Sequence, residues 1–223
     1  SNLPRLVTGD LVVWSDDGAD GGVVLALGQR RNFFGRPSPE GQFKAMAANI
    51  DSVLVVFASS PTPHVSLIDR YLVAIEQLQL TAVLVLNKLD LLNQEELTNL
   101  DSMLSPYRDI GYPVYKVSAE DGRGMIELEE LLASQTTILV GQSGVGKSSL
   151  LNKLSSGKLA DVAPLSETWG RGTHTTTTSS LYHMPGFDLI DSPGIREFGL
   201  GHIDEQQVFE GFIEFRQFAG SCK

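Results

Sequence analysis

The sequence has little of three things: cysteine, long apolar runs and basic charge. Its single cysteine, Cys222, excludes an internal disulfide framework and is typical of a reducing compartment. The longest apolar runs, 53–58 and 82–86, fall far short of the roughly 20 residues that a membrane-spanning helix needs. The sequence also opens without the hydrophobic stretch of a signal peptide. We therefore expect a cytoplasmic protein that does not bind membranes.

Basic residues are outnumbered, with 17 lysines and arginines against 27 aspartates and glutamates, so the formal net charge is −10. Proteins that bind nucleic acid over a broad surface use Lys and Arg to neutralise phosphates. The deficit is uneven, because residues 1–48 carry five basic and five acidic side chains and residues 49–223 carry 12 and 22. A generally basic surface is excluded, whereas contact with nucleic acid through local patches is not.

The pattern of the chain changes near residue 49. Before it, short strands at 10–14 and 23–27, separated by a turn rich in Gly and Asp, predict a small β-domain over residues 1–48. After it, apolar strands alternate with helices that have one apolar face. The predicted strands are 53–58, 82–86, 114–117, 137–140 and 187–190, and the predicted helices are 65–75, 95–104, 125–132 and 205–218. This alternation predicts an α/β domain over residues 49–218, with a mostly parallel sheet covered on both faces.

A phosphate loop follows the strand 137–140. Residues 141–148 read GxxxxGKS and run into a helix, which is the context that this motif requires. Its glycines let backbone N–H groups close around phosphates at the helix N-terminus. We expect Lys147 to reach the β- and γ-phosphates and to assist catalysis, and the Ser148 hydroxyl to bind Mg²⁺. The predicted phosphate contacts are Gly141, Gln142, Ser143, Gly144, Val145, Gly146, Lys147, Ser148 and Ser149.

The segment Asn-Lys-Leu-Asp at 87–90 ends another strand and indicates which base is bound. The carboxylate of Asp90 can accept two hydrogen bonds from the N1–H and exocyclic amine of guanine, which adenine cannot offer. We expect Asn87 to brace this loop and the stem of Lys88 to lie along the base, and we include Leu89 among the nucleotide-binding residues. Alone, the motif is also a common turn sequence. Together with a phosphate loop it predicts a GTP site and makes an ATP-using kinase the weaker reading.

Three further segments complete this prediction. Ser118 and Ala119 follow the strand 114–117, where a backbone N–H can meet the guanine O6. The segment 191–194 has the form DxxG, in which Asp191 reaches Mg²⁺ through water and the N–H of Gly194 senses the γ-phosphate; a plain turn is the alternative. The loop 170–178 resembles a first switch segment, which would offer one threonine hydroxyl to Mg²⁺. That threonine is Thr176 or Thr177, and a solvated loop leading to an edge strand is the alternative.

The residue after the DxxG glycine is Ile195, where Ras-like enzymes place a glutamine that orients the attacking water. Isoleucine cannot do this, so we expect hydrolysis by the chain alone to be slow. His174 is the only imidazole in the loop 170–178, and a neutral ring can orient water. His174 is therefore the candidate catalytic residue beside Lys147.

The guanine motif precedes the phosphate loop, whereas ordinary GTPases have the opposite order. This order resembles the circularly permuted GTPases. With the segments AANID at 47–51, IDRYL at 68–72, HTTT at 174–177 and DSPGIREFG at 191–199, the chain resembles, over essentially its whole length, the ribosome small-subunit-dependent GTPase family, RsgA/YjeQ. Because the DxxG segment lies close to the end of the fold, we also expect the nucleotide state to be transmitted through residues 195–218 toward the C-terminus.

The resemblance implies an OB-fold domain before the GTPase domain and a zinc-binding domain after it. It also implies ribosome-stimulated GTP hydrolysis late in maturation of the 30S subunit, with 16S rRNA as a partner, and a catalytic role for His174. Residues 1–48 would be a partial OB-fold domain. Residues 219–223 would begin the zinc-binding domain, with Cys222 the first Zn²⁺ ligand of a site that is incomplete in this sequence. We expect a monomer.

Basic and aromatic residues alternate in the segment 30–36, as they do on OB-type RNA-binding surfaces. The predicted RNA contacts are Arg30, Arg31, Phe33 and Arg36, with Phe34 among them. The alternative, held equal, is that the phenylalanines pack toward the GTPase domain while the arginines are merely solvated. For the whole chain, the leading hypothesis is a GTP-hydrolysing switch enzyme, and the alternative is an RNA- or ribosome-binding scaffold whose nucleotide site is mainly structural.

Overall fold

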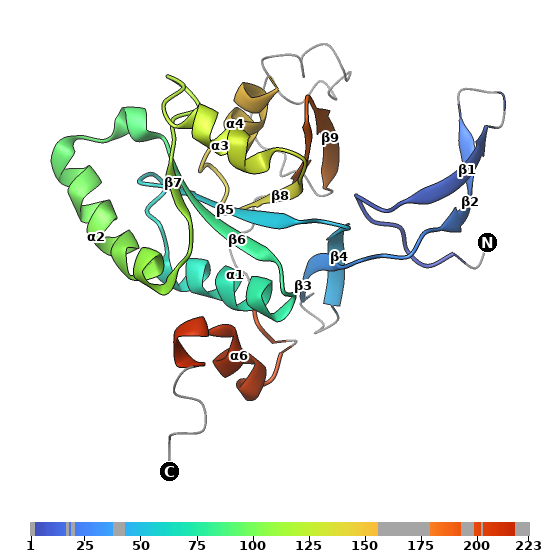
Figure 1. The fold of residues 1–223 in the computed structure, drawn as a ribbon, viewed down its shortest axis with the longest axis horizontal. Coiled ribbons are helices and arrows are strands. Elements are labelled where there is room, and N and C mark those ends of the chain that lie inside the picture. Colours follow the sequence, from blue (N-terminus) through green and yellow to red (C-terminus); the bar gives the residue numbers. More distant parts are fainter. Residues whose placement is uncertain are drawn as a thin grey trace.

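The computed structural model describes residues 3–16, 18, 21–37, 43–155, 179–192, 199–201 and 203–216. Its centre is a six-stranded sheet in the order β7-β6-β5-β8-β10-β9 (Figure 1). Every neighbouring pair is parallel except β9 with β10. The strands are β5 (Ser52–Ala58), β6 (Thr81–Asn87), β7 (Val114–Lys116), β8 (Thr136–Val140), β9 (Ser180–Met184) and β10 (Phe187–Asp191). The predicted α/β architecture with a mostly parallel sheet is confirmed.

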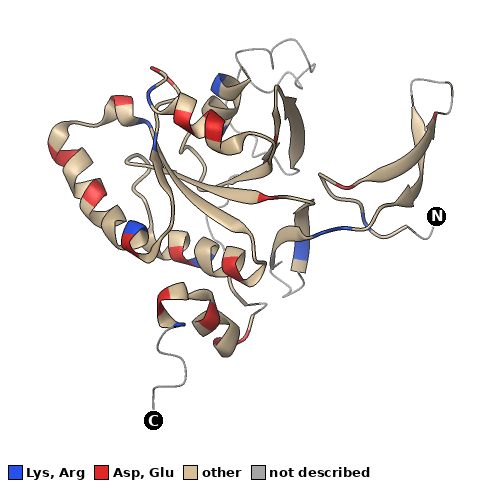
Figure 2. Ribbon diagram, in the orientation of Figure 1, with Lys and Arg blue, Asp and Glu red and all other residues tan. Residues whose placement is uncertain are grey.

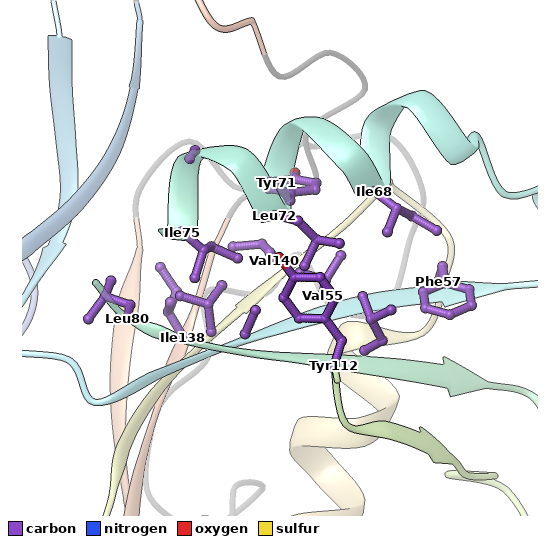
Figure 3. Packing of buried hydrophobic residues seen from close by; sticks show 14 of the residues in the cluster. Val55, Phe57, Ile68, Tyr71, Leu72, Ile75, Leu80, Tyr112, Ile138 and Val140 are labelled. Carbon is purple, nitrogen blue, oxygen red and sulfur yellow. The ribbon is translucent and has the colours of Figure 1, made fainter. Parts of the chain in front are cut away.

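Helices cover both faces of this sheet, with α1 and α2 on one face and α3 and α4 on the other (Figure 1). They are α1 (Val65–Gln77), α2 (Gln94–Ile110), α3 (Met125–Leu132) and α4 (Lys147–Leu154). Strand β5 is buried along its whole length, and its side chains alternate between two cores. Val55 and Phe57 pack toward α1 (Figure 3), whereas Leu54 and Val56 pack with residues of α3 and α4. An apolar run with no polar alternation is thus explained by a strand buried on both sides.

The order of the strands brings the predicted guanine motif and phosphate loop to one edge of the sheet, although the guanine motif comes first in the sequence. The first strand of the domain, β5, lies in the middle of the sheet; the chain then adds β6 and β7 on one side and returns to add β8 and β10 on the other. Because these strands are parallel, the loops that follow β6, β7, β8 and β10 all leave from the same edge. That edge, near the point where the strand order reverses, is where α/β sheets bind ligands.

The N-terminal region forms two separate antiparallel pairs. These are β1 (Val12–Asp16) with β2 (Gly22–Leu27), and β3 (Phe33–Pro37) with β4 (Phe43–Ala48). The first pair projects away from the sheet (Figure 1), whereas Phe34 of β3 is buried in the core that also holds Ile138 and Ile190. These short antiparallel strands fit an OB-like domain. Strands β3 and β4 were not predicted, because the mixed charged and aromatic sequence at 30–36 suggested a surface instead.

The predicted helix 205–218 is wrong in its length. Helix α6 (Glu205–Gly211) ends at Gly211, Phe212 is extended, and a short 3-10 helix (Ile213–Phe215) follows. Glycine is a poor helix former, and a Cβ at this glycine would lie only 2.7 Å from Val73 Cγ1 of α1. The helix therefore stops where its backbone approaches α1 closely. No helix in the described ranges is long and apolar enough to cross a membrane.

Candidate nucleotide-binding site

The phosphate loop joins β8 to the start of α4, which begins at Lys147. Gly141, Gly144 and Gly146 have φ values of +141°, +86° and +92°, a region that favours glycine. A Cβ on Gly141 would collide with the backbone carbonyl of Val56. The loop therefore has the conformation that turns backbone N–H groups inward at a helix N-terminus, as phosphate binding requires.

Lys147 is buried inside this loop. Its Nζ donates hydrogen bonds to the carbonyl oxygens of Gly141 and Gln142, both at 3.0 Å. Burial lowers the pKa of Lys147, and the nearby carboxylate of Asp191 opposes that shift. An ammonium group held in this way is positioned to exchange the loop carbonyls for phosphate oxygens, in line with the predicted role.

Asn87 connects three loops through a single side-chain amide. Its Nδ2 donates to the carbonyl of Val145 in the phosphate loop at 3.0 Å, and its Oδ1 accepts from the N–H of Ala119 at 3.2 Å. The residue is only 1% exposed, and a buried polar group left unpaired would cost about 1–3 kcal/mol. The expected bracing role thus extends to the phosphate loop. A backbone N–H of the Ser-Ala segment is expected to meet guanine O6, and in the structure the Ala119 N–H has a protein partner.

Asp90 is held by Ser118. The Ser118 hydroxyl, which is fully buried, donates to Asp90 Oδ1 at 2.6 Å and accepts from the N–H of Asp121 at 3.2 Å. This chain of hydrogen bonds fixes the carboxylate that is expected to read the base. The role of the Ser118 hydroxyl was not predicted, because Ser118 and Asp90 lie 28 residues apart in sequence and meet only on folding.

Lys88 crosses from the guanine motif to the phosphate loop. It has a left-handed backbone, with φ of +66°, and its Nζ donates to the carbonyls of Gly144 at 2.6 Å and Ser60 at 2.8 Å. Beside it lies a pocket of about 170 Å³. The pocket is lined by Asn87, Lys88, Asp90, Leu91, Ala119, Glu120, Gly146 and Ser149. Residues of the guanine motif, the Ser-Ala segment and the phosphate loop therefore share one cavity.

Asp191 lies at the end of β10, opposite Leu139 of the phosphate-loop strand. The neighbouring Ser192 hydroxyl donates to the carbonyl of Leu139, which holds the end of β10 against β8. Burial raises the pKa of Asp191 to about 6, and the positive charge of Lys147 opposes this. Its Oδ1 is buried and has no hydrogen-bond partner among the described residues.

An unpartnered carboxylate oxygen close to Lys147 and the start of α4 fits a hard cation such as Mg²⁺, which prefers oxygen ligands. Ser148, on the first turn of α4, offers a second oxygen. The described residues contain no group of three or more His, Cys, Asp or Glu that could hold a metal. Mg²⁺ is usually held by one or two protein oxygens together with phosphates and water.

Several predicted site residues lie outside the described part of the chain. These are His174, Thr176, Thr177, Gly194 and Cys222, and the side chain of Arg36 is not described either. Their roles stay predictions.

The predicted RNA contacts are engaged within the protein to different degrees. Arg30 binds Asp10 at 2.7 and 2.8 Å and the carbonyl of Arg5 at 2.8 Å. Arg31 pairs with Asp51 at 2.9 Å. Phe34 is buried, as the alternative interpretation expected, whereas Phe33 is 41% exposed. Arg30 and Arg31 are thus paired with protein groups rather than merely solvated.

Comparison with known proteins decides the family. Residues 27–201 match the model of the RsgA GTPase family. This chain belongs to the RsgA GTPase family. It is 52% identical over 224 residues to the small ribosomal subunit biogenesis GTPase RsgA of Azotobacter vinelandii, and 50% identical to that of Pseudomonas fluorescens strain SBW25. In both comparisons the alignment covers 100% of this chain and 65% of the relative, so the chain spans about two thirds of the length of these relatives.

Solved structures agree with this assignment. The crystal structure of YjeQ from Thermotoga maritima superimposes with a TM-score of 0.72 at 30% identity, covering 96% of this chain and 69% of that one. The structure of YloQ, described as a circularly permuted GTPase, gives 0.71 at 28% identity, covering 100% and 69%. The predicted resemblance and the circularly permuted GTPase fold are confirmed.

Replacing Gly146 by alanine should disconnect the guanine motif from the phosphate loop. The new Cβ would collide with Asn87 Nδ2, in addition to the strain of about 1 kcal/mol that a left-handed φ imposes on alanine. We expect the free energy of unfolding of Gly146→Ala to fall by about 2–3 kcal/mol beyond the cost of that strain. We also expect the variant to bind guanine nucleotide much more weakly. Urea unfolding and nucleotide titration measure the two effects.

Gly186→Ala is the matched control. Gly186 has a similar φ of +94°, but a Cβ there would meet nothing within 4 Å. It should therefore show the strain alone and leave nucleotide binding unchanged. If the two variants lost equal amounts of stability and nucleotide affinity, the bridging role of Asn87 would be contradicted.

The raised pKa of Asp191 predicts how stability depends on pH without Mg²⁺. Between pH 3.8, the ordinary pKa of an aspartate, and about pH 6, the Asp191 carboxyl group keeps its proton in the folded protein but has released it in the unfolded chain. Its contribution to stability therefore falls as pH rises through this window. The side chain in Asp191→Asn carries no charge. The free energy of unfolding of this variant should therefore rise relative to that of wild type by on the order of 2–3 kcal/mol between pH 4 and pH 7. Urea unfolding in EDTA measures this, and a difference that does not change with pH would contradict it.

Proposed function

We propose that the chain binds GTP with Mg²⁺, hydrolyses it to GDP and phosphate, and acts as a switch in late maturation of the 30S ribosomal subunit, which stimulates the hydrolysis. The observation that carries the GTP site is the buried amide of Asn87, which joins the guanine motif, the Ser-Ala segment and the phosphate loop at one edge of the sheet. The names of the relatives, small ribosomal subunit biogenesis GTPases, support the assembly role.

Selection of guanine rests on Asp90. Its carboxylate would accept hydrogen bonds from N1–H and the exocyclic amine, and Ser118 holds it in place at 2.6 Å. Adenine would leave those oxygens without the two donors that guanine offers, which is costly. The stem of Lys88, held at both its backbone and its ammonium end, would support the base.

Phosphate binding rests on the backbone of residues 141–149 and on Lys147. The loop presents N–H groups and the α4 N-terminus to negative charge. Ser148, Asp191 through water, and one of Thr176 and Thr177 would hold Mg²⁺, and the N–H of Gly194 would sense the γ-phosphate. Mg²⁺ supplies neutralisation of the charge that develops on the phosphate oxygens during transfer.

Orientation of the attacking water is the weakest part of this site. Ile195 occupies the position where a glutamine would serve, so slow intrinsic turnover is expected, and His174 is the candidate that orients water. A stimulating partner would complete this element, as partners do for other GTPases that hydrolyse slowly alone.

Contact with 16S rRNA is proposed for the N-terminal β-domain. Lysines and arginines lie on and just before the β3–β4 pair, whereas the helices of the GTPase domain carry many acidic residues (Figure 2). Phe33 is exposed and could stack on a base. Arg30 and Arg31 would have to exchange their carboxylate partners for phosphates, and Arg36 is the fourth candidate.

We further propose the domain division 1–48, 49–218 and 219–223, with the last segment beginning a zinc-binding domain whose first ligand is Cys222. We expect the protein to be a cytoplasmic monomer that does not bind membranes.

Replacing Asp90 by asparagine should change the preferred base. An asparagine amide can donate to the C2 oxygen of xanthine and accept from N1–H, but it meets the guanine amine donor to donor. We expect the affinity for GDP to fall by a factor on the order of 100, while the affinity for the xanthine nucleotide rises. Asp109→Asn, an exposed change on α2, is the control and should alter neither. Unchanged GDP affinity in Asp90→Asn would contradict this assignment.

Turnover with and without 30S subunits tests the proposed function as a whole. We expect purified subunits to accelerate GTP hydrolysis by about tenfold or more, and His174→Ala to lose most of that acceleration. GTP binding with no acceleration would favour the scaffold alternative. Equal affinity for ADP and GDP would contradict a guanine site altogether.

A further inference from the structure

The turn formed by residues 7–10 lies against the part of the sheet that carries Asp191. The Thr8 hydroxyl donates to the carbonyl of Ser179 at 2.8 Å, across 171 residues of sequence. Ser179 immediately precedes β9, and the next residue, Ser180, is paired with Asp191 in the β9–β10 ladder. The N-terminal region therefore contacts the strand that borders the proposed magnesium carboxylate.

A second contact reaches the other strand. Gly9 has φ of +87°, and a Cβ built on it would lie 3.4 Å from Ile190 Cδ1 and would collide with the carbonyl of Ala48. Ile190 directly precedes Asp191. The turn thus contacts the start of β9 through Thr8, and Gly9 lies near the Ile190 side chain of β10, which by strand alternation is on the face opposite the Asp191 carboxylate.

The turn is held firmly in this position. Asp10 Oδ2 accepts from the N–H of Val7 at 2.8 Å, and Arg30 binds both oxygens of Asp10 at 2.7 and 2.8 Å. The Asp10 side chain is only 2% exposed. Two-pronged arginine–carboxylate pairs with this burial hold their geometry better than ordinary surface pairs. Two backbone anchors are added, from Ala48 N–H to the Thr8 carbonyl at 2.9 Å and from Asn49 Nδ2 to the Gly9 carbonyl at 2.9 Å.

The strand that follows Ser179 lies at the edge of the described sheet. Within the described sheet β9 is an edge strand, paired only with β10. Edge strands have hydrogen bonds on one side only and open more easily than central strands. A fixed hydrogen bond at the start of β9 therefore limits how far this strand, and the end of β10 beside it, can move.

We propose that the turn 7–10 is a brace that positions Asp191 for Mg²⁺, with Thr8 as a positioning residue that acts through Ser179 and β9. While Arg30 is paired with Asp10 it anchors the brace, and the exchange of that carboxylate for a phosphate, as proposed for RNA contact, would release the anchor. The brace links the N-terminal β-domain directly to the metal side of the nucleotide site. This inference rests on the proposed function in one respect, the role of Asp191 toward Mg²⁺.

The test compares Thr8→Val, which keeps the shape but removes the hydroxyl, with Thr8→Ser, which keeps the hydroxyl. Hydrogen exchange of the amides of residues 181–183 is measured in the protein without metal or nucleotide. The Mg²⁺ concentration that half-saturates retention of fluorescent GDP is measured separately. We expect Thr8→Val to raise the β9 exchange rate and the half-saturating Mg²⁺ concentration about threefold to tenfold, as loss of one hydrogen bond predicts. Thr8→Ser should restore both.

Arg30→Gln, which removes the anchor of the turn, should act in the same direction and replaces Thr8→Val if that variant does not fold. Wild-type behaviour of Thr8→Val or Arg30→Gln in both measurements would overturn the proposal. A variant with lower stability but an unchanged half-saturating Mg²⁺ concentration would also overturn the proposal. That result would show that the Thr8–Ser179 hydrogen bond stabilises the fold without positioning Asp191. Failure of the wild-type chain to bind GDP would instead refute the proposed function, and the exchange of β9 would still report on the brace.

Discussion

The buried amide of Asn87 is the interaction on which the rest of the site depends. It is nearly inaccessible to water, so both its donor and its acceptor must find protein partners. It finds them in two loops that are far apart in sequence, at Val145 and Ala119. Two positions are constrained as a result: Gly146 must remain glycine beside the amide, and the Ser-Ala segment must approach close enough to donate an N–H.

Circular permutation leaves this arrangement intact because the sheet, not the order of the chain, determines which loops meet. Parallel strands deliver the guanine motif, the Ser-Ala segment, the phosphate loop and Asp191 to the same edge. What permutation changes is the location of the chain ends. The segment after Asp191 leads into α6, which packs on α1 through Gly211 and through a 2.7 Å hydrogen bond from Gln77 to the carbonyl of Gln207.

Helix α6, near the end of the proposed domain 49–218, and the N-terminal region therefore both contact the central part of the GTPase domain. The sequence predicted transmission of the nucleotide state toward the C-terminus, and the docking of α6 on α1 is compatible with it. The structure adds a contact on the N-terminal side, where Thr8 binds the carbonyl of Ser179 at the start of β9, the strand that pairs with β10 beside Asp191. A buried carboxylate with one oxygen lacking a hydrogen-bond partner is a costly element, and support of the neighbouring strand is a physical means of keeping it in place.

Local patterns in the sequence were enough to predict the parallel sheet, the permuted order and the main motifs, because each is encoded within a few neighbouring residues. Apolar runs report strands buried on both faces, and GKS or NKxD motifs carry their chemistry within a few residues. Helix 125–132 was predicted with the bounds that the structure shows. Tertiary structure decided the rest: the end of α6 at Gly211, the pairing of β3 with β4, the partner of the Ala119 N–H and the engagement of Arg30 with Asp10. Each of these depends on a group brought close only by folding, such as Val73 beside Gly211 or Asn87 beside Ala119, and no local pattern records it.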